Sequence, residues 1–549
     1  MGPTSVPQIG TVPGSYSIPD SEKGNAELKR SLHTGQGPCK ARSTTIEHCL
    51  LSRRSNQSLK RFFIWLLISI SLSLLLSTSA IACYRVYRRR DLLFGERKDS
   101  DTYDAGAPFA PFKTQRLWGA YSPYYSVEEY SPPPDDCRLT QVNIIQRHGA
   151  RYPTFSLSVR MAKALLKLQA AEHYIDPRLQ FVSDYRYDLG TDDLLPFGEF
   201  QTYESGRKAF VRYGSLSSGE NLPFVRASGS DRVIKSAFKW IDGKSSASHN
   251  TLKPVLALII PEKDGWNNTL EDKSCPNAGQ SEKEVQKWQS IYAKPIADQL
   301  NAAAYGLPEN LTAEDAESLI ALCALDTVAK EEYSQFCDLF SEEDFKGYEY
   351  SMDLEKFYYT GYGSPLGSVQ GVGYINELLA RLTDQPVQDH TQTNSTLDSK
   401  PETFPLGRGI YIDFSHDNLM VAVISAMGMT GNHIKAQSDT RPILDPTRYQ
   451  ENRDWYISKF VPFSGRMVVE RMECGNARAA GRFGNASLER GQRDGSGSAV
   501  YVRILIDDAV QNLAICKGSK DGLCTLEDFV ESQRYARENG QGDWEECFK

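Results

Sequence analysis

The chain has 549 residues, of which 40% are hydrophobic and 11% aromatic, so it is globular for most of its length and too long for one ordinary core. Its net charge of -8 hides an asymmetry, because residues 1–98 contain 15 Lys and Arg against 6 Asp and Glu, whereas the remainder contains 47 against 64. Such an acidic body excludes binding of nucleic acid through a broad basic surface, so any phosphate must bind in a local basic pocket.

The N-terminal region differs in composition from the rest of the chain. Residues 1–61 are rich in Ser, Gly, Pro and Thr and are predicted to form a disordered cytosolic tail. The uncharged run 62–83 has 22 residues, enough to span a hydrocarbon core of about 30 Å as a helix. We interpret it as a transmembrane signal-anchor, because a leader of about sixty residues is far longer than the usual n-region of a cleaved signal peptide. Residues 84–130 are predicted to be a stalk whose later part packs on a folded domain.

Cysteines and glycosylation sequons indicate the orientation of this anchor. Eight of the 11 cysteines follow it, an even number that suits a disulfide framework. Four sequons also follow it, and their acceptor residues are Asn267, Asn310, Asn394 and Asn485. We therefore expect a single-pass type II membrane protein with a lumenal or extracellular C-terminal domain. Cleavage within the anchor, or at the basic run 88–90, would instead yield a secreted protein.

The folded domain is predicted over residues 131–549, beginning at a stiff triple proline. Strand-like runs occur at 139–145, 224–227, 254–260, 410–414 and 502–506. Helical patterns occur at 157–171, 281–303, 313–324 and 373–382. Because the strands lie near both ends, we predict an α/β sheet domain from about 131–270 and 400–549, with a mostly α-helical insertion at about 271–399.

A polar run follows the first predicted strand, at the carboxyl edge where open α/β sheets usually bind ligands. In this run Arg147 and Arg151 bracket His148. Two planar guanidinium groups can hold a phosphoryl group beside the imidazole ring, and Gly149 permits close approach of the loop. A histidine between two arginines is by itself more often part of a solvated loop. Further motifs must therefore decide whether this run is a phosphate-binding site.

The sequence Arg147-His148-Gly149-Ala150-Arg151-Tyr152-Pro153 resembles the signature of the histidine acid phosphatases, in the form found in fungal phytases and related acid phosphatases. Two later runs resemble the same family in the same order. Residues 224–233 contain its third phosphate-binding arginine, which corresponds to Arg232 or, less favourably, to Arg226. Residues 411–418 contain its His-Asp pair, His416 and Asp417. The similarity extends over 117–547.

The resemblance implies a fold and a disulfide pattern. The fold is a histidine-phosphatase (phosphoglycerate mutase-like) sheet domain with an inserted, mostly helical domain. The eight C-terminal cysteines allow about 105 connectivities, and the resemblance implies Cys137–Cys474, Cys275–Cys547, Cys323–Cys337 and Cys516–Cys524.

It also implies a mechanism without a metal or another cofactor. His148 would attack phosphorus to form a phosphohistidine, and Asp417 would protonate the leaving group. Arg147, Arg151, Arg232 and His416 would bind the phosphoryl oxygens. An acidic pH optimum is expected, because Asp417 must be protonated and His416 favours its charged form.

The substrate class is a phosphate monoester, and two substrate ranges remain open. Phytases often have lysines around the pocket, whereas here residues 155–159 contain none and Ser183 occupies another such position. The enzyme is therefore either a 3-phytase that acts on phytate (myo-inositol hexakisphosphate) or a broad acid phosphatase. Alternatives are a mutase with the same core, or an anchored surface protein that retains the fold without catalysis. The intact His148, His416 and Asp417 disfavour the last.

Overall fold

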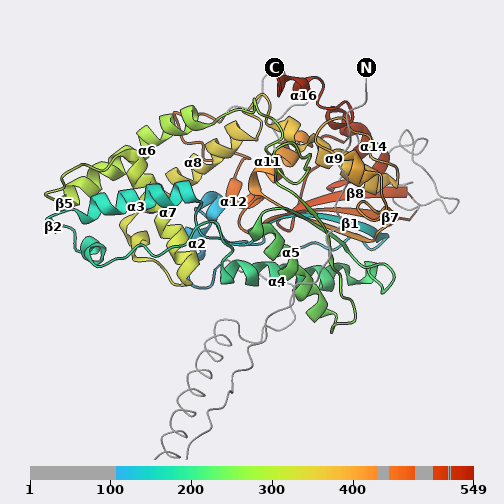
Figure 1. Ribbon diagram of the computed structural model, residues 1–549, viewed down its shortest axis with the longest axis horizontal. Helices are drawn as coiled ribbons and strands as arrows, with labels where there is room; N and C mark the ends of the chain where they lie inside the picture. The colour runs from blue at the N-terminus through green and yellow to red at the C-terminus, as the bar shows by residue number, and fades with distance from the viewer. Residues whose placement is uncertain (1–106, 430–443, 476–498, 517–518, 520) are drawn as a thin grey trace, which may run out of the picture. The chain divides into compact units, whose positions relative to one another are not determined.

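The computed structural model describes residues 107–429, 444–475, 499–516, 519 and 521–549. Its main sheet has the strand order β10-β8-β7-β1-β6-β3-β4, with β9 paired to β8. Figure 1 labels β1, β7 and β8 of this sheet. The strands are β1 (Cys137–Arg147), β3 (Phe224–Ser228), β4 (Leu256–Ile260), β6 (Ile410–Ser415), β7 (Arg466–Cys474), β8 (Ala499–Ile506), β9 (Ala509–Val510) and β10 (Leu523–Thr525). This confirms the predicted α/β class.

The central strands are parallel and the far ones antiparallel. β1, β6, β3 and β4 run in the same direction, whereas β7, β8 and β10 alternate beyond β1. Parallel neighbours bring their carboxyl ends to one edge of the sheet. The three predicted motifs therefore emerge side by side, although they are separated by up to about 270 residues of chain.

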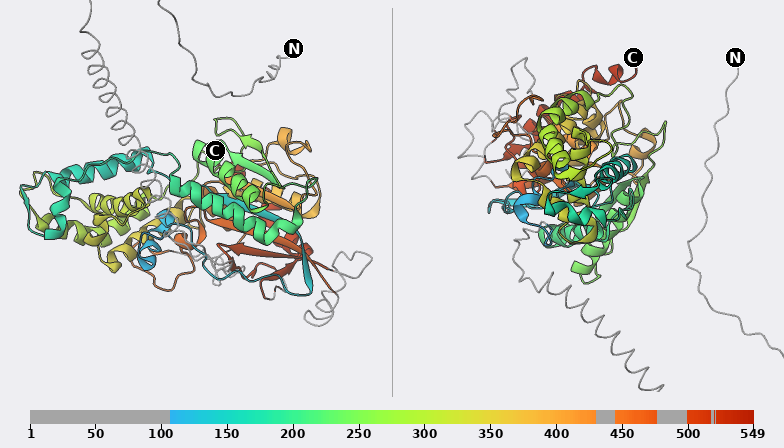
Figure 2. Two further views of the ribbon diagram at one scale, coloured as in Figure 1. Left: turned by 90° about the horizontal axis from the view of Figure 1, so that it is seen from below. Right: turned by 90° about the vertical axis from the view of Figure 1, so that its left-hand side faces the viewer.

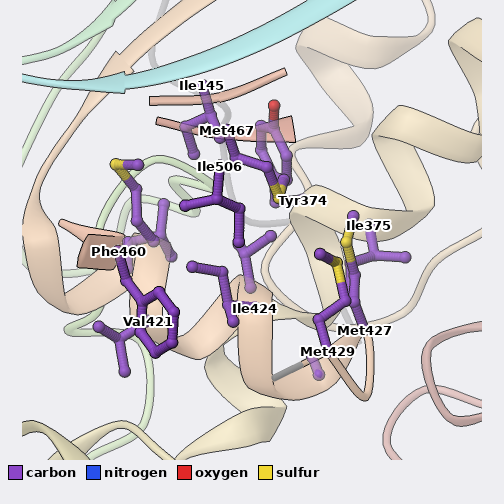
Figure 3. Packing of buried hydrophobic residues seen from close by; sticks show 14 of the residues in the cluster. Ile145, Tyr374, Ile375, Val421, Ile424, Met427, Met429, Phe460, Met467 and Ile506 are labelled. Carbon is purple, nitrogen blue, oxygen red and sulfur yellow. The ribbon is translucent and has the colours of Figure 1, made fainter. Parts of the chain in front are cut away.

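Helices cover both faces of this sheet. The helices α4 (Pro196–Tyr213) and α5 (Asp231–Ala247) lie on one face, and α9 (Val372–Thr383) and α11 (Asp417–Ala426) on the other (Figure 1). Seen from below in Figure 2, the green helices α4 and α5 lie in front of the strands. Successive residues of a strand point to opposite faces, so Ile144 packs in the cluster with α4 and α5, whereas Ile145 packs in the cluster with α9 and α11 (Figure 3).

A second apolar cluster joins the helices α3 (Phe155–Gln169), α6 (Glu282–Ala303), α7 (Ala313–Lys330) and α8 (Glu342–Tyr359). α3 thus packs with helices from the predicted insertion although it lies outside 271–399, and α9 lies within that range but packs on the sheet. The limits of the insertion and of the other domains remain predictions. What the structure shows is that the helical layer is built from two separate segments of the chain.

The remaining elements are short. They are α2 (Phe112–Gln115), η1 (Gly119–Tyr121), β2 (His173–Tyr174), η2 (Pro177–Ser183), η3 (Gly214–Leu216), β5 (Ala304–Tyr305), η4 (Gln335–Leu339), η5 (Ser368–Gly371), α10 (Ser395–Asp398), α12 (Ile457–Phe460), α14 (Leu526–Ser532), α15 (Arg534–Arg537) and α16 (Asp543–Glu546). β2 pairs with β5 in a separate two-stranded sheet.

The end of the predicted stalk packs on the folded body, as its aromatic residues suggest. Trp118 is completely buried, and the hydroxyl groups of Tyr124 and Tyr130 donate hydrogen bonds to Asp508 and Glu470, at 2.8 and 3.1 Å. The predicted tail 1–61 and anchor 62–83 lie outside the described residues. Within the described ranges, no helix has the length and apolar character that crossing a membrane requires.

The described residues contain four disulfide bonds, two of which join distant parts of the chain. The pairs Cys137–Cys474, Cys275–Cys547, Cys323–Cys337 and Cys516–Cys524 are all present, as the family resemblance implies. The first joins β1 to β7 across a separation of 337 residues, and the second ties the C-terminus to the segment before α6 across 272 residues. Both close long loops, which is where a cross-link restricts the unfolded chain most.

Candidate active site

Three segments meet at the carboxyl edge of the parallel strands. Arg147 ends β1 and His148 follows it, while His416 lies between β6 and α11, Asp417 is the first residue of α11, and Arg232 lies in the first turn of α5. The rings of His148 and His416 are 5.7 Å apart between centroids, and Arg147 Nη2 is 3.2 Å from Asp417 Oδ2. The predicted residues therefore form one site.

His148 is buried and held in a defined tautomer. Its Nδ1 lies 2.8 Å from the carbonyl oxygen of Gly149. A carbonyl oxygen only accepts hydrogen bonds, so Nδ1 carries the proton and the lone pair is on Nε2. Burial, together with the positive charges of Arg147, Arg232 and Arg151, lowers the pKa of His148 well below its ordinary value. The imidazole is therefore neutral, and nucleophilic, in mildly acidic solution.

Arg147 is fixed by backbone carbonyl groups and an aromatic ring. Its Nη1 donates hydrogen bonds to the carbonyl oxygens of Ala120 and of Val461, the latter at 2.7 Å. Its guanidinium carbon lies 4.6 Å from the centroid of the Phe463 ring. Burial lowers the pKa of Arg147 to about 10, so the group remains a cation at the acidic pH where the site would work.

Arg151 and Arg232 complete a cationic pocket. Arg151 Nη1 donates to the carbonyl oxygen of Tyr152 at 2.8 Å, and Arg232 Nη1 lies 3.8 Å from Asp192 Oδ1. Among the described residues, the buried Nε atoms of Arg147, Arg151 and Arg232 have no hydrogen-bond partner. Guanidinium donors of this kind suit the oxygens of a phosphoryl group.

Arg226, the weaker alternative for the third arginine, has a different environment. It is buried on β3, where Nε lies 2.7 Å from Asp413 Oδ1 and Nη2 lies 2.5 Å from Glu377 Oε2. Asp413 also pairs with Arg381 at 2.6 Å. Two carboxylates occupy the Arg226 guanidinium, so of the two candidates it is Arg232 that contributes charge beside His148.

Asp417 lies between two cations at the N-terminus of α11. Its Oδ2 is 3.2 Å from Arg147 Nη2 and 3.2 Å from Lys356 Nζ. Burial alone would raise the pKa of Asp417, but the charges of Arg147 and Lys356 hold it well below its ordinary value. The sequence predicts an acidic optimum on the expectation that acid protonates Asp417 directly. The geometry corrects this expectation, because the two neighbouring cations keep Asp417 ionised.

His416 is held by a second carboxylate, that of Glu262. His416 Nε2 lies 2.8 Å from Glu262 Oε1, which also accepts hydrogen bonds from Ser228 Oγ at 2.7 Å and Ser230 N at 3.0 Å. Burial opposes ionisation of Glu262, but His416 and these two serines lower its pKa to about 2. The carboxylate therefore stays charged in acid and orients the imidazole.

Glu262 and Lys356 are not among the site residues that the sequence predicts. Glu262 had a usable signal, because it follows β4 at the same carboxyl edge as the other motifs. Lys356 had none, since it is one of many charged residues on α8 and reaches Asp417 only through the tertiary fold.

Metal independence and glycosylation are two further predictions from the sequence. Among the described residues, no group of three or more His, Cys, Asp or Glu side chains is placed to hold a metal ion, and metal-independent chemistry remains a prediction. The predicted glycosylation sites Asn267 and Asn310 are exposed and Asn394 is half-buried, whereas Asn485 lies outside the described residues. Glycosylation at these positions also remains a prediction.

Comparison with known proteins identifies the family. Residues 138–507 match the model of the histidine phosphatase superfamily (branch 2). The chain belongs to this superfamily. It is 40% identical to phytase A of Aspergillus fumigatus over 471 residues, covering 82% of this chain and 94% of the relative. Phytase A of Emericella nidulans is 39% identical over 466 residues, covering 82% and 93%.

A solved structure with this superfamily's fold is similar in its chain trace. The phytase from D. castellii superimposes with a TM-score of 0.61 at 22% sequence identity, over 78% of this chain and 86% of the other. This likeness bears on the fold, which agrees with the α/β histidine-phosphatase architecture.

Replacing Glu262 tests how the site is held together. Its pKa falls from 4.5 to about 2 on folding, so its contribution to stability is present above pH 4.5 and is lost as the pH falls toward 2. Glu262→Gln should lower the free energy of unfolding by about 2 kcal/mol at pH 6, with a smaller loss near pH 3. Urea unfolding across this range measures the difference. The exposed Glu129→Gln is the control, and an equal loss at both pH values would refute the assignment.

Proposed function

We propose that this protein is a histidine acid phosphatase that hydrolyses phosphate monoesters, including phytate, through a phosphohistidine on His148. One observation carries the proposal. A neutral imidazole with a free Nε2 lies among three guanidinium groups, beside a carboxylate that can serve the leaving group. Membership of the superfamily and the identity with fungal phytases support the same chemistry.

In the first step, the lone pair of His148 Nε2 attacks phosphorus while the bond from phosphorus to the leaving oxygen breaks. Arg147, Arg151 and Arg232 neutralise the charge on the phosphoryl oxygens. His416 Nε2 pairs with Glu262, so His416 can donate a further hydrogen bond to the same group only from Nδ1. Asp417 gives a proton to the departing oxygen, so that an alcohol leaves instead of an alkoxide.

The proton on Asp417 must arrive with the substrate. The free site keeps this carboxyl group ionised, and a phosphate monoester has a second pKa near 6. Below that pH the ester enters as a monoanion, and its phosphoryl oxygens engage the cations that hold Asp417 ionised. The proton then moves from the phosphoryl group to Asp417. An acidic optimum follows from the protonation of the substrate.

In the second step, water attacks the phosphohistidine. Asp417, now a carboxylate, accepts a proton from this water as the bond between nitrogen and phosphorus breaks. Inorganic phosphate leaves, and the lone pair returns to Nε2. The carbonyl oxygen of Gly149 accepts from Nδ1 throughout and keeps the ring in one orientation.

A broad acid phosphatase is the second candidate, and the rim of the pocket favours it. Phe155 is 70% exposed and Val159 is 51% exposed on α3, where phytases often have lysines. The backbone N–H of Phe155 donates to Asp192, which in turn faces Arg232. An apolar side chain at Phe155, close to Asp192 and Arg232, would accept esters with apolar alcohols.

A panel of assays on the purified C-terminal domain tests the proposal. We expect hydrolysis of both phytate and p-nitrophenyl phosphate at acidic pH, unaffected by a metal chelator, and only background activity for His148→Ala. The ratio of kcat/KM between the two substrates ranks phytase against broad phosphatase. Activity that survives in His148→Ala, or that disappears with chelator, would overturn the mechanism. A folded but inactive wild type would favour the non-catalytic surface protein.

Asp417→Asn separates protonation of the leaving group from binding. Loss of a general acid typically costs about 10²- to 10⁴-fold, and we expect a loss of this size with phytate, whose leaving group is an alkoxide. The first step with p-nitrophenyl phosphate should slow much less, because p-nitrophenolate leaves without a proton. Rapid mixing should then show a burst of p-nitrophenol. An equal loss of the first step with both substrates would mean that Asp417 only positions the phosphate.

We further propose that residues 62–83 anchor the protein as a type II membrane protein, with the enzyme in the secretory lumen or outside the cell. The uncharged run and the sequons at Asn267 and Asn310 support this arrangement. In cells, the full chain should remain with membranes after carbonate extraction and should lose mass on treatment with an N-glycosidase. Absence of any mass change would count against a lumenal domain, and an extractable, shortened chain would indicate cleavage.

A further inference from the structure

Away from the phosphate pocket, Arg453 is buried between two carboxylates of α8. Its Nε lies 2.6 Å from Asp353 Oδ2, and its Nη2 lies 3.0 Å from Glu349 Oε2. The side chains of all three are at most 5% exposed. Glu349 and Asp353 are four residues apart and so lie on one face of the helix. A guanidinium fork fits this arrangement, whereas a lysine ammonium would reach the two carboxylates as a single point charge.

The same carboxylates bind the chain that follows Arg453. Asp353 Oδ1 accepts a hydrogen bond from the backbone N–H of Ile457 at 2.7 Å, and Glu349 Oε1 accepts one from Ser458 Oγ at 2.6 Å. The indole N–H of Trp455 donates to the backbone carbonyl oxygen of Asp353 at 3.1 Å. Residues 453–458 are therefore fastened to α8 at several points, and we call this stretch the clasp.

The clasp leads directly into the site. Three residues beyond it, the carbonyl oxygen of Val461 accepts from Arg147 Nη1 at 2.7 Å. Phe463 then packs against both Arg147 and His148, with the two rings 6.2 Å apart between centroids. Between the clasp and Val461, Phe460 packs in the same apolar cluster as Val421 of α11, the helix that begins with Asp417 (Figure 3).

The other partner of the clasp, α8, also reaches the site. Lys356 lies one turn after Asp353 on the same helix, and its Nζ is 3.2 Å from Asp417 Oδ2 and 2.7 Å from Asn418 Oδ1. The two cations that contact Asp417 are thus connected to the clasp in different ways. Lys356 lies on α8, the helix to which the clasp is bonded. Arg147 contacts Val461 and Phe463, which follow the clasp in the chain.

We propose that Arg453 is a positioning residue for the reaction: by joining α8 to residues 453–464, it sets the distances of Lys356 and Arg147 from Asp417. This inference rests on the proposed function, in which Asp417 donates the proton. If the clasp loosens, Asp417 keeps less of the positive charge that lowers its pKa. Loss of Arg453 should therefore change the pH dependence of the reaction as well as its rate.

Arg453→Met and Arg453→Lys test this role in the full chain. For Arg453→Met we expect a loss of kcat on phytate of about tenfold, within the range that small misplacements of catalytic groups cause. The basic limb of its kcat profile should move to higher pH, because Asp417 then holds its proton more tightly. KM should change less than kcat. Arg453→Lys keeps a charge between the carboxylates and should recover part of both effects.

Arg503→Met is the matched control. Arg503 is also a buried arginine with a carboxylate partner, with Nε 2.7 Å from Glu470 Oε2, but it joins β7 to β8 instead of leading to His148. Its loss should destabilise the fold without moving the pH profile. Cooperative urea unfolding identifies which variants are folded. If Arg453→Met does not fold, Arg453→Lys alone tests the role, and its pH profile should shift less.

The outcomes separate the two proposals. The positioning role is wrong, and the proposed function stands, if folded Arg453→Met has the wild-type kcat and pH profile. The same conclusion follows from Arg453→Lys if only that variant folds. If Arg503→Met moves the pH profile as much as Arg453→Met, the effect is general destabilisation and the role is also wrong. If the wild type does not hydrolyse phosphate esters, or His148→Ala remains active, the proposed function itself fails.

Discussion

The contact between Arg147 and Asp417 is the interaction on which the rest of the site depends. Three arginines close to a buried histidine repel one another, and their burial also disfavours their charges. The carboxylate of Asp417, 3.2 Å from Arg147 Nη2, offsets part of this repulsion. The two N–H groups on Nη1 of Arg147 need acceptors as well, and they find them in the carbonyl groups of Ala120 and Val461. Burying one guanidinium thus requires α11, η1 and the segment after α12 to meet around it.

The parallel part of the sheet could be predicted because each of its strands contains a short run of mostly apolar residues. The strands β1, β3 and β6 were expected within a few residues of their observed bounds, and the motif residues followed at their carboxyl ends. β7 was missed for a physical reason. Its sequence contains Arg466, Glu470 and Arg471, which hide the alternation of a strand. Glu470 is nevertheless buried, because Arg503 of β8 supplies the opposite charge. A charge pair between two strands has no signature in either strand alone.

In the candidate site too, some residues could be predicted from the sequence and others could not. His148, Arg147, Arg151, His416 and Asp417 were found because each belongs to a short run that resembles the family. The choice between Arg232 and Arg226 needed coordinates, because only the fold shows that Arg226 is occupied by Asp413 and Glu377. Lys356 and Arg453 were beyond reach for a further reason. Each acts through a partner more than sixty residues away along the chain, and nothing local in the sequence distinguishes them from other charged residues.

Chemistry and substrate range are carried by different kinds of contact in this site. The phosphoryl pocket is built from buried groups whose positions depend on backbone carbonyl groups and ion pairs, so few of them can change without loss of the reaction. Phe155, whose backbone N–H donates to Asp192 beside Arg232, has by contrast an exposed side chain that the core does not constrain. Under the proposed function, a change of this side chain would alter which alcohol is accepted and leave the attack by His148 unaltered. The same phosphohistidine chemistry can therefore serve a highly charged polyphosphate or a simple ester, and the residues that decide between them are those that contribute least to the fold.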